Sequence, residues 1–388
     1  MINNLLYILT ISLLFLPLAI FGLYGIVLFY FYKKDKISRI SRIPGYQPKV
    51  TVLIPTHNEE NMIGKKIENL LVLDYPQEKT EIIFVDDSTD TTPAIIEDYA
   101  KKSPSIHLIH FNERKGYSPS MIAGCQSATG EIIVFNDAGS LLDASAIRNI
   151  VRNFEDPKIG GVTGRPEILN KNENIGQSED WYLMLSDFMR KGETNMDSTF
   201  HFNGEACSVR RELIKGLSRC PATFDTASAL FVRQKGFRTI YDPSIKFYEY
   251  APNTHSDRIK QKVIRATNMI QILLQFKEMI FRPQFGWFGS FILPMNLIML
   301  TIVPILVFAG MVALIMLTLV NLSLSIVLWG IIGISILFSF LFTKHAVSTF
   351  IEFEYILLRA IYNVIIKKET YDKMDRAEST RRFDNLNT

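Results

Sequence analysis

Hydrophobic residues are distributed unevenly along this chain of 388 residues. Apolar side chains dominate 4–32 and roughly 286–343, whereas 49–270 alternates short apolar runs with polar segments. A helix needs about 20 apolar residues to cross the hydrocarbon core of a bilayer. The pattern therefore predicts a soluble block of strands and helices flanked by membrane-spanning segments.

The first apolar run predicts a transmembrane helix over 4–32. A secretory signal that is not cleaved is the alternative, but the run is too long for the apolar region of a signal and has no small-residue cleavage site. Loops rich in Lys and Arg stay on the cytoplasmic side of a membrane, and this run is followed by Lys33, Lys34, Lys36, Arg39 and Arg42. We therefore expect the soluble block to face the cytoplasm.

The C-terminal apolar region predicts two further transmembrane helices, over 291–320 and 324–342, separated by a turn at Asn321. Pro294 and Pro304 fall in the first of them and are tolerated where neighbouring helices satisfy the freed backbone groups.

Two amphipathic segments flank these helices. Residues 259–285 mix basic and apolar side chains and are predicted to lie in the plane of the interface. Residues 345–388 are predicted to form an interfacial helix and a cytoplasmic tail, because Glu352, Glu354 and Arg359 argue against a fourth span.

Charge and composition agree with a membrane protein. The net charge of +3 is too small to indicate a nucleic-acid partner, and the basic residues cluster beside the apolar ends. Such clusters are typical of contacts with anionic lipid headgroups. We expect an integral protein of the plasma membrane, with the soluble block and the C-terminus in the cytoplasm.

The soluble block repeats a unit of strand, turn and helix. Strands alternating with helices predict a doubly wound, mostly parallel α/β sheet, here with strands at 49–55, 81–85, 106–111 and 131–135 and helices at 60–73, 93–102 and 120–128. Ligands of such sheets bind at the carboxyl ends of the strands, and the acidic residues of this block follow strand ends. A binding site is expected there.

These strand ends carry motifs that resemble the inverting family-two glycosyltransferases, which have a nucleotide-sugar-binding GT-A fold. The matching segments follow one another in the family's order, at Ile54–Glu60, Val85–Asp90, Arg114–Gly116, Thr129–Phe135, Gly161–Arg165, Gly204–Arg211, Lys235–Arg238 and Ala251–Thr254. The flanking spans are similar to those of the membrane-bound members, the polysaccharide synthase and lipid-linked sugar transferase group. The resemblance implies a GT-A catalytic domain over 49–258.

The resemblance also implies a nucleotide-sugar site. Asp86 or Asp87, with Thr56 and Glu59, stand at positions that bind the nucleotide, and Lys115 stands where the diphosphate charge is neutralised. The alternative is that Asp87 and its neighbours form a turn and a helix cap, and that Lys115 is a solvated loop lysine.

The family's metal motif is altered in this chain. Its D-x-D sequence supplies two carboxylates to a divalent cation on the diphosphate, but here Asp137 is followed two residues later by Gly139. Mg²⁺ uses few carboxylates together with phosphates and waters. We expect Mg²⁺ or Mn²⁺ to bind through Asp137 and the donor.

The resemblance places the catalytic base at Asp225, which follows Thr223 and Phe224 where the family has T-E-D. A base there deprotonates the acceptor hydroxyl as its oxygen attacks the anomeric carbon. A helix N-cap is the alternative role of Asp225. Gly204 and Glu205 match acceptor-binding positions.

A third departure concerns the family's Q-x-x-R-W motif. Gln261 matches the glutamine, Ile264 replaces the arginine and Arg265 replaces the tryptophan. Gln261 and Arg265 are four residues apart and share a helical face, so Arg265 is predicted to stabilise the leaving diphosphate. The missing tryptophan argues against a synthase of long chains.

Together these patterns predict an enzyme that moves a sugar from a UDP- or GDP-sugar to a lipid-linked or growing glycan acceptor at the cytoplasmic membrane face. Its expected partners are the donor, the acceptor and membrane lipids. A processive polysaccharide synthase is one alternative. A non-catalytic homologue that binds or assists a partner is the other, suggested by Ile264, Gly139 and Phe224.

Overall fold

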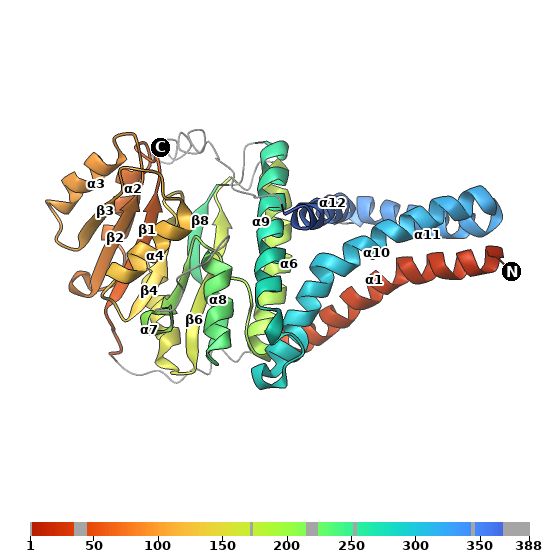
Figure 1. Ribbon diagram of the computed structural model, residues 1–388, viewed down its shortest axis with the longest axis horizontal. Coiled ribbons are helices and arrows are strands. Elements are labelled where there is room, and N and C mark those ends of the chain that lie inside the picture. The colour runs from red at the N-terminus through yellow and green to blue at the C-terminus, as the bar shows by residue number, and fades with distance from the viewer. Residues whose placement is uncertain are drawn as a thin grey trace.

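The computed structural model describes residues 2–34, 45–170, 174–214, 224–250, 254–342 and 346–367. A sheet domain lies at one end of the molecule and long apolar helices extend from the other (Figure 1). Two helices, α6 (Asn174–Met196) and α9 (His255–Gln275), lie between these two parts.

The sheet domain contains an eight-stranded mixed sheet with the order β3-β2-β1-β4-β7-β6-β8-β5. Strands β3, β2, β1 and β4 are parallel, whereas β7 is antiparallel to both β4 and β6. The doubly wound sheet expected from the sequence is therefore confirmed for the first half. The strands are β1 (Val50–Thr56), β2 (Thr80–Asp86), β3 (Ile106–His110), β4 (Ile132–Phe135), β5 (Leu141–Leu142), β6 (Ile159–Ile168), β7 (Cys207–Arg210) and β8 (Arg238–Glu249).

Both faces of the sheet are buried under helices. Along β1, Val50, Val52 and Ile54 point to one hydrophobic cluster, while Leu53 points to the other. This alternation follows from the two-residue repeat of a strand, and a strand covered on both faces reads as a continuous apolar run. The remaining helices of the sheet domain are α2 (Ile63–Leu71), α3 (Thr92–Ala100), α4 (Tyr117–Ser127), α5 (Ala146–Val151), α7 (Arg211–Ile214) and α8 (Phe224–Gln234).

Helix α6 was not predicted from the sequence, because its apolar positions are diluted by charged ones. Its Glu193 is buried and joins it to two apolar helices, α1 (Ile2–Tyr32) and α10 (Leu293–Val320). Tyr24 Oη donates to Glu193 Oε1 at 2.6 Å, and Asn296 Nδ2 donates to the same oxygen at 2.9 Å. The polar side chains of α6 thus fix the sheet domain against the apolar helices.

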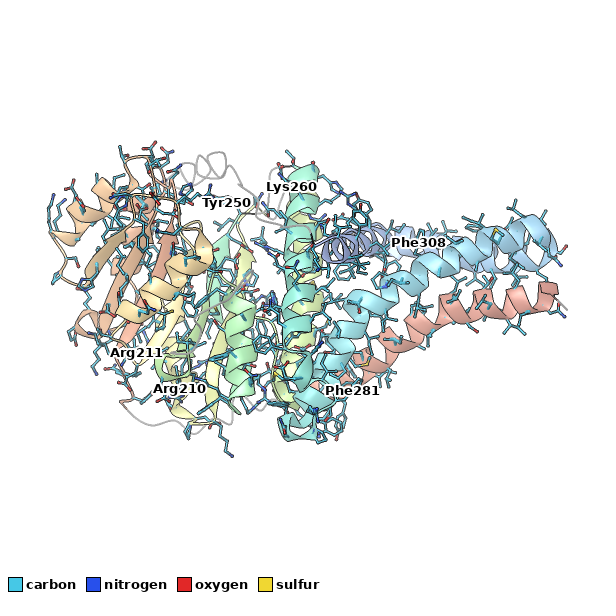
Figure 2. The ribbon with its side chains drawn as sticks, in the orientation of Figure 1. Arg210, Arg211, Tyr250, Lys260, Phe281 and Phe308 are labelled. Atoms are coloured by element: carbon cyan, nitrogen blue, oxygen red, sulfur yellow. The ribbon has the colours of Figure 1, made fainter. Side chains whose placement is uncertain are left out.

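Within the described residues, two helices are long and apolar enough to cross a membrane, at Asn4–Tyr32 and Phe288–Val320. Only 17% and 33% of their most apolar windows are buried within the protein, so they differ from core helices. Exposed side chains such as Phe308 cover α10 (Figure 2). Apolar surface on this scale marks an interaction with lipid or protein, and the length of the two helices fits a membrane.

In the described part of the chain after α10, two more helices follow. They are α11 (Leu322–Phe342), whose shorter apolar stretch is Leu322–Ile334, and α12 (Ala346–Ile365). Helix α12 packs along α9, where Arg258 is paired with Glu352. The π-helical turn Phe288–Ile292 precedes α10, so the apolar helix begins before the expected residue 291. The division into spans and interfacial segments stays a prediction, and the part of the tail beyond 367 lies outside the described residues.

Candidate active site

The carboxyl ends of β1 and β2 bring Thr56 and Asp86 together. Asp86 is fully buried, and its Oδ1 accepts hydrogen bonds from Thr56 Oγ1 at 2.7 Å and Ser88 Oγ at 2.5 Å. Its Oδ2 accepts the Ser88 N–H at 3.1 Å and lies 2.8 Å from His110 Nδ1. Asp86 therefore holds the strand end and the following turn in one conformation.

Asp87 organises a neighbouring loop. Its Oδ2 accepts the backbone N–H groups of Lys115 and Gly116, both at 2.9 Å, and its Oδ1 lies 2.8 Å from His57 Nδ1. Gly116 has a φ of 83°, which suits glycine because it lacks a Cβ. These bonds tie Asp87 to a loop further along the chain, whereas in the turn before α3 it is Asp90 Oδ1 that accepts the Thr92 N–H, at 3.0 Å. A carboxylate has about four acceptor sites, which leaves capacity for a ligand.

Two other predicted nucleotide residues lie close to this edge. Glu59 is buried just before α2, and its N–H donates to Thr92 Oγ1 at 2.8 Å. Lys115 is exposed, with its Nζ 5.9 Å from the centre of the Phe111 ring. The nucleotide-binding roles of Thr56, Glu59, Asp86, Asp87 and Lys115 remain predictions.

Beyond the end of β4, the carboxylates of Asp137, Glu205 and Asp225 lie near enough for their charges to interact. The charges of Asp137 and Glu205 both act on Asp225. Gly204 is also close to Asp225, because a Cβ at this position would lie 3.3 Å from Asp225 Oδ2 and 3.6 Å from Tyr117 Oη. The sequence predicted Asp137, Gly204, Glu205 and Asp225 as site residues, and the fold places them in one cluster.

Burial and the neighbouring acids raise the pKa of Asp225 to about 7, although the N–H of Thr226 opposes this shift by donating to Asp225 Oδ1 at 2.7 Å. A carboxylate in an apolar setting loses hydration, and nearby negative charges disfavour ionisation further. The hydrogen bond to Thr226 is part of the capping role that was the alternative for Asp225. A pKa near neutrality is suited to a group that accepts a proton at neutral pH.

Arg265 supplies positive charge to the cluster from α9. Its Nη2 donates to Glu205 Oε1 at 3.3 Å, and the Arg265 side chain as a whole is 67% exposed. Arg265 therefore reaches the carboxylates while remaining accessible to an anionic ligand. Gln261 lies one turn earlier on α9 and is half-buried. Lys260 lies near the start of α9, and Phe281 follows its end (Figure 2).

Sequence reasoning missed three residues of this region. Tyr117 Oη is 3.5 Å from Asp137 Oδ1, and burial holds the pKa of its hydroxyl well above the usual value, so the phenol is a donor. His201 Nδ1 lies 3.0 Å from Thr226 Oγ1, and burial holds its pKa well below the usual value. Lys66 lies beneath the loop that carries Asp137. The position of Tyr117 directly after the predicted Arg114–Gly116 motif was the one available signal.

A divalent cation fits this site only if the donor supplies ligands. Among the described residues, no group of three or more His, Cys, Asp and Glu side chains is arranged to hold a metal ion. The loop offers Asp137 but has Gly139 at the second position of the expected motif. Oxygen atoms of a diphosphate are suitable further ligands for Mg²⁺.

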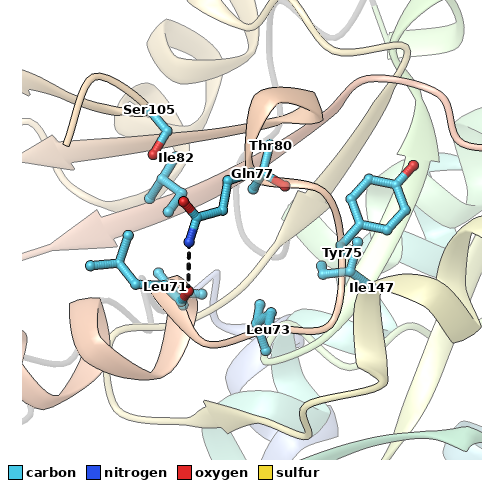
Figure 3. A pocket seen from close by; sticks show the side chains of 9 residues that line it. Leu71, Leu73, Tyr75, Gln77, Thr80, Ile82, Ser105 and Ile147 are labelled. Carbon is cyan, nitrogen blue, oxygen red and sulfur yellow. Dashed lines mark hydrogen bonds between the residues drawn. The ribbon is translucent and has the colours of Figure 1, made fainter.

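A small pocket lies elsewhere, at the amino ends of β2 and β3 (Figure 3). Gln77 Nε2 donates to the Leu71 carbonyl at 3.2 Å at its edge. The lining is mostly apolar and contains no acidic or basic side chain, and it consists of Leu70, Leu71, Leu73, Tyr75, Gln77, Thr80, Ile82, Ser105 and Ile147. This pocket is at the opposite edge of the sheet from the carboxylates and is not a candidate active site.

Residues 51–217 match the family model described as Glycosyl transferase family 2. The matched segment includes Asp86, Asp87, Asp137 and Glu205 but ends before Asp225.

Curated relatives extend the similarity beyond that segment. The poly-beta-1,6-N-acetyl-D-glucosamine synthase of Staphylococcus aureus is 25% identical over 277 residues, which are 68% of this chain and 66% of the relative. The enzyme of the same name from Staphylococcus epidermidis is 24% identical over 273 residues, with the same shares. The match thus spans slightly less than two thirds of the length of these relatives.

Among solved structures, a mannosyltransferase from Pyrobaculum calidifontis, in complex with GDP-Man and Mn²⁺, aligns with a TM-score of 0.75. It is 24% identical, and the alignment covers 94% of this chain and 100% of that one. The alignment therefore includes the apolar helices as well as the sheet domain, and it confirms the GT-A fold expected from the sequence.

Proposed function

We propose that this chain, which carries a glycosyl transferase family 2 domain over residues 51–217, is an inverting, membrane-anchored glycosyltransferase. It transfers a sugar from a nucleotide-diphosphate sugar to a lipid-linked or growing glycan acceptor. The observation that carries the proposal is the cluster of Asp137, Glu205 and Asp225 beside Arg265, in which one carboxyl has a pKa near 7.

In the proposed reaction, Asp225 accepts the proton of an acceptor hydroxyl. The freed electron pair of that oxygen forms a bond to the anomeric carbon of the donor, on the face opposite the leaving group. The bond from the anomeric carbon to the diphosphate oxygen breaks, and the nucleoside diphosphate leaves with both electrons. Arg265 stabilises the negative charge that develops on the diphosphate, as preorganised cations do in general.

We place the donor at the carboxyl ends of the strands. Asp86 and Asp87 fix the turns that would contact the nucleoside, while Lys115 and Arg265 are accessible cations for the diphosphate. Asp137 would hold Mg²⁺ or Mn²⁺ together with the diphosphate, and such a cation neutralises phosphate charge when bound. The Pyrobaculum calidifontis mannosyltransferase was solved in complex with both GDP-Man and Mn²⁺, which supports this assignment.

The named relatives support a glycan product. Both Staphylococcus enzymes are synthases of a poly-N-acetylglucosamine, which favours the processive alternative for this chain. The position of Ile264 and Arg265 in place of the family's arginine and tryptophan favours a single transfer instead. The grouping of Asp225 with Asp137, Glu205 and the cation of Arg265 speaks against a non-catalytic role.

A panel of donors tests the function. Purified protein in detergent is mixed with UDP- and GDP-sugars, and thermal stability and donor hydrolysis are measured with and without Mn²⁺. One nucleotide class should raise the melting temperature, because a ligand that binds the folded state stabilises it. Binding without hydrolysis or transfer to any glycolipid acceptor would favour the binding-subunit alternative.

The proposed orientation places the sheet domain and the C-terminus in the cytoplasm of a plasma membrane. A cysteine at Asn321, between α10 and α11, should then react with an impermeant thiol reagent added outside intact cells. A cysteine at Ser256, at the start of α9, should react only after the membrane is opened. The reverse labelling pattern would contradict this topology.

The affinity of the protein for a divalent metal ion should depend on bound nucleotide. Because the loop offers Asp137 but no carboxylate at Gly139, Mn²⁺ affinity should be weak alone and should rise when UDP or GDP is present, since coupling between two ligands is reciprocal. Gly139→Asp should tighten Mn²⁺ binding. Calorimetric titration measures both effects. Activity that resists EDTA, together with no nucleotide-dependent Mn²⁺ binding, would exclude Asp137 as a ligand.

A further inference from the structure

Lys66 is an unusual residue of the sheet domain, because it is 0% exposed and lysine is almost never fully buried unless its charge is compensated. It lies on the inner face of α2, where its buried neighbours are Ile63, Ile67 and Leu70. An ammonium that is removed from water is strongly disfavoured unless other groups compensate for its charge. An aliphatic residue would serve packing on this face equally well, so the charge itself requires an explanation.

The ammonium of Lys66 is directed at the loop that follows β4. It donates to Asn136 Oδ1 and to the Ser140 carbonyl, the two ends of the segment that contains Asp137 and Gly139. Asn136 Nδ2 in turn donates to the Glu205 carbonyl. Lys66 thus connects α2 to the loop of Asp137, and through Asn136 to the segment that carries Glu205.

Acidic groups act on Lys66 through space. Burial lowers the pKa of Lys66 to about 7, while the charges of Asp137 and then Glu59 oppose that shift. The electrostatic attraction between the Lys66 ammonium and the Asp137 carboxylate is mutual. A fixed positive charge attracts a polyanion and repels a second cation, with an energy that falls as distance and dielectric constant rise.

We propose that Lys66 is a built-in cation of the donor loop, which favours the anionic diphosphate and opposes a free divalent cation at Asp137. The inference rests on the proposed function, because it assumes that a nucleoside diphosphate binds above this loop. It also explains why the loop can have Gly139 where the family has a second carboxylate. With one carboxylate and an internal ammonium, the loop depends less on a metal ion to bind the diphosphate.

The test measures the affinity for nucleotide and the affinity for Mn²⁺, because removal of the Lys66 charge should change the two in opposite directions. Lys66→Met and Lys66→Gln both remove the charge, but glutamine retains a hydrogen-bond donor. Calorimetry at about pH 6, where the wild-type amine is protonated, follows the binding of UDP and GDP in EDTA and of Mn²⁺ without nucleotide. In both variants the nucleotide affinity should fall roughly tenfold and the Mn²⁺ affinity should rise by a similar factor.

Lys65→Met is the matched control, since Lys65 is the half-buried neighbour on the same helix, and both affinities should stay at wild-type values. If both affinities fall in Lys66→Met and recover in Lys66→Gln, Lys66 is a hydrogen-bonded support of the loop and the charge proposal is wrong. Unchanged affinities in both Lys66 variants overturn the inference alone. Failure of the wild-type protein to bind either nucleotide overturns the proposed function and this inference with it.

Discussion

Asp225→Asn should reduce the transfer rate by roughly 10²–10⁴-fold, which is the usual contribution of a general base. Asparagine has nearly the same shape and still accepts the Thr226 N–H through its oxygen, so the fold of the site should survive. The donor does not need the proton-accepting oxygen, and nucleotide affinity should stay within about twofold of wild type. Steady-state transfer and calorimetry on the same preparation measure both quantities.

Two comparisons decide whether Asp225 acts as the general base or only as a helix cap. Asp197→Asn changes a carboxylate that binds the Phe288 N–H outside the cluster, and it should lower stability more than the rate at saturating substrate. If Asp225→Asn weakens nucleotide binding and the transfer rate equally, Asp225 is a structural residue and the base lies elsewhere.

The pH dependence of the rate follows from the raised pKa of Asp225. A base must be deprotonated to act, so the value of kcat/KM should be low below about pH 7 and should rise to a plateau above it. The rising limb should disappear in Asp225→Asn, whose residual activity no longer depends on that ionisation. A rate that falls with pH through this range would exclude the assignment.

Arg265→Gln should lower kcat by roughly 10²–10³-fold, as removal of a donor to a developing negative charge does in other enzymes. The Arg265 side chain is largely exposed and its guanidinium lies beside Glu205, so it is placed to contact a diphosphate bound at the carboxylate cluster. The loss should be larger in kcat than in donor affinity, because charge on the leaving group increases in the transition state.

Lys260→Gln provides the control for Arg265, since it removes one positive charge from an exposed position of the same helix. Its effect should be small and should weaken further in high salt, as for surface charges in general. A rise in KM without a change in kcat in Arg265→Gln would show that Arg265 binds the donor but does not stabilise the transition state.

The first half of the sheet could be predicted from the order of residues alone. In β1 and β2, continuous apolar runs predict strands that are buried on both faces, and the structure has them at Val50–Thr56 and Thr80–Asp86. The polar residues that follow such strands meet at one sheet edge whatever the remaining packing is. Thr56, Asp86 and Asp87 could therefore be identified as neighbours before the fold was known.

The second half of the sheet could not be predicted in this way. Strand β7 has only four residues and pairs antiparallel with β4 and β6, and a short segment carries no signal for its partner or its direction. Helix α6 was not predicted for a related reason. Its Glu193 looks solvated in the sequence, but it is buried against Tyr24 and Asn296.

The chemistry of the site also depends on tertiary contacts. Asp225 was found from its motif, but its raised pKa depends on burial and on Asp137 and Glu205. Lys66 was not found at all, because its partners Asn136 and Ser140 are 70 and 74 residues away along the chain. Strand patterns arise from local alternation, whereas the charge state of a buried side chain depends on every group that folding brings near it.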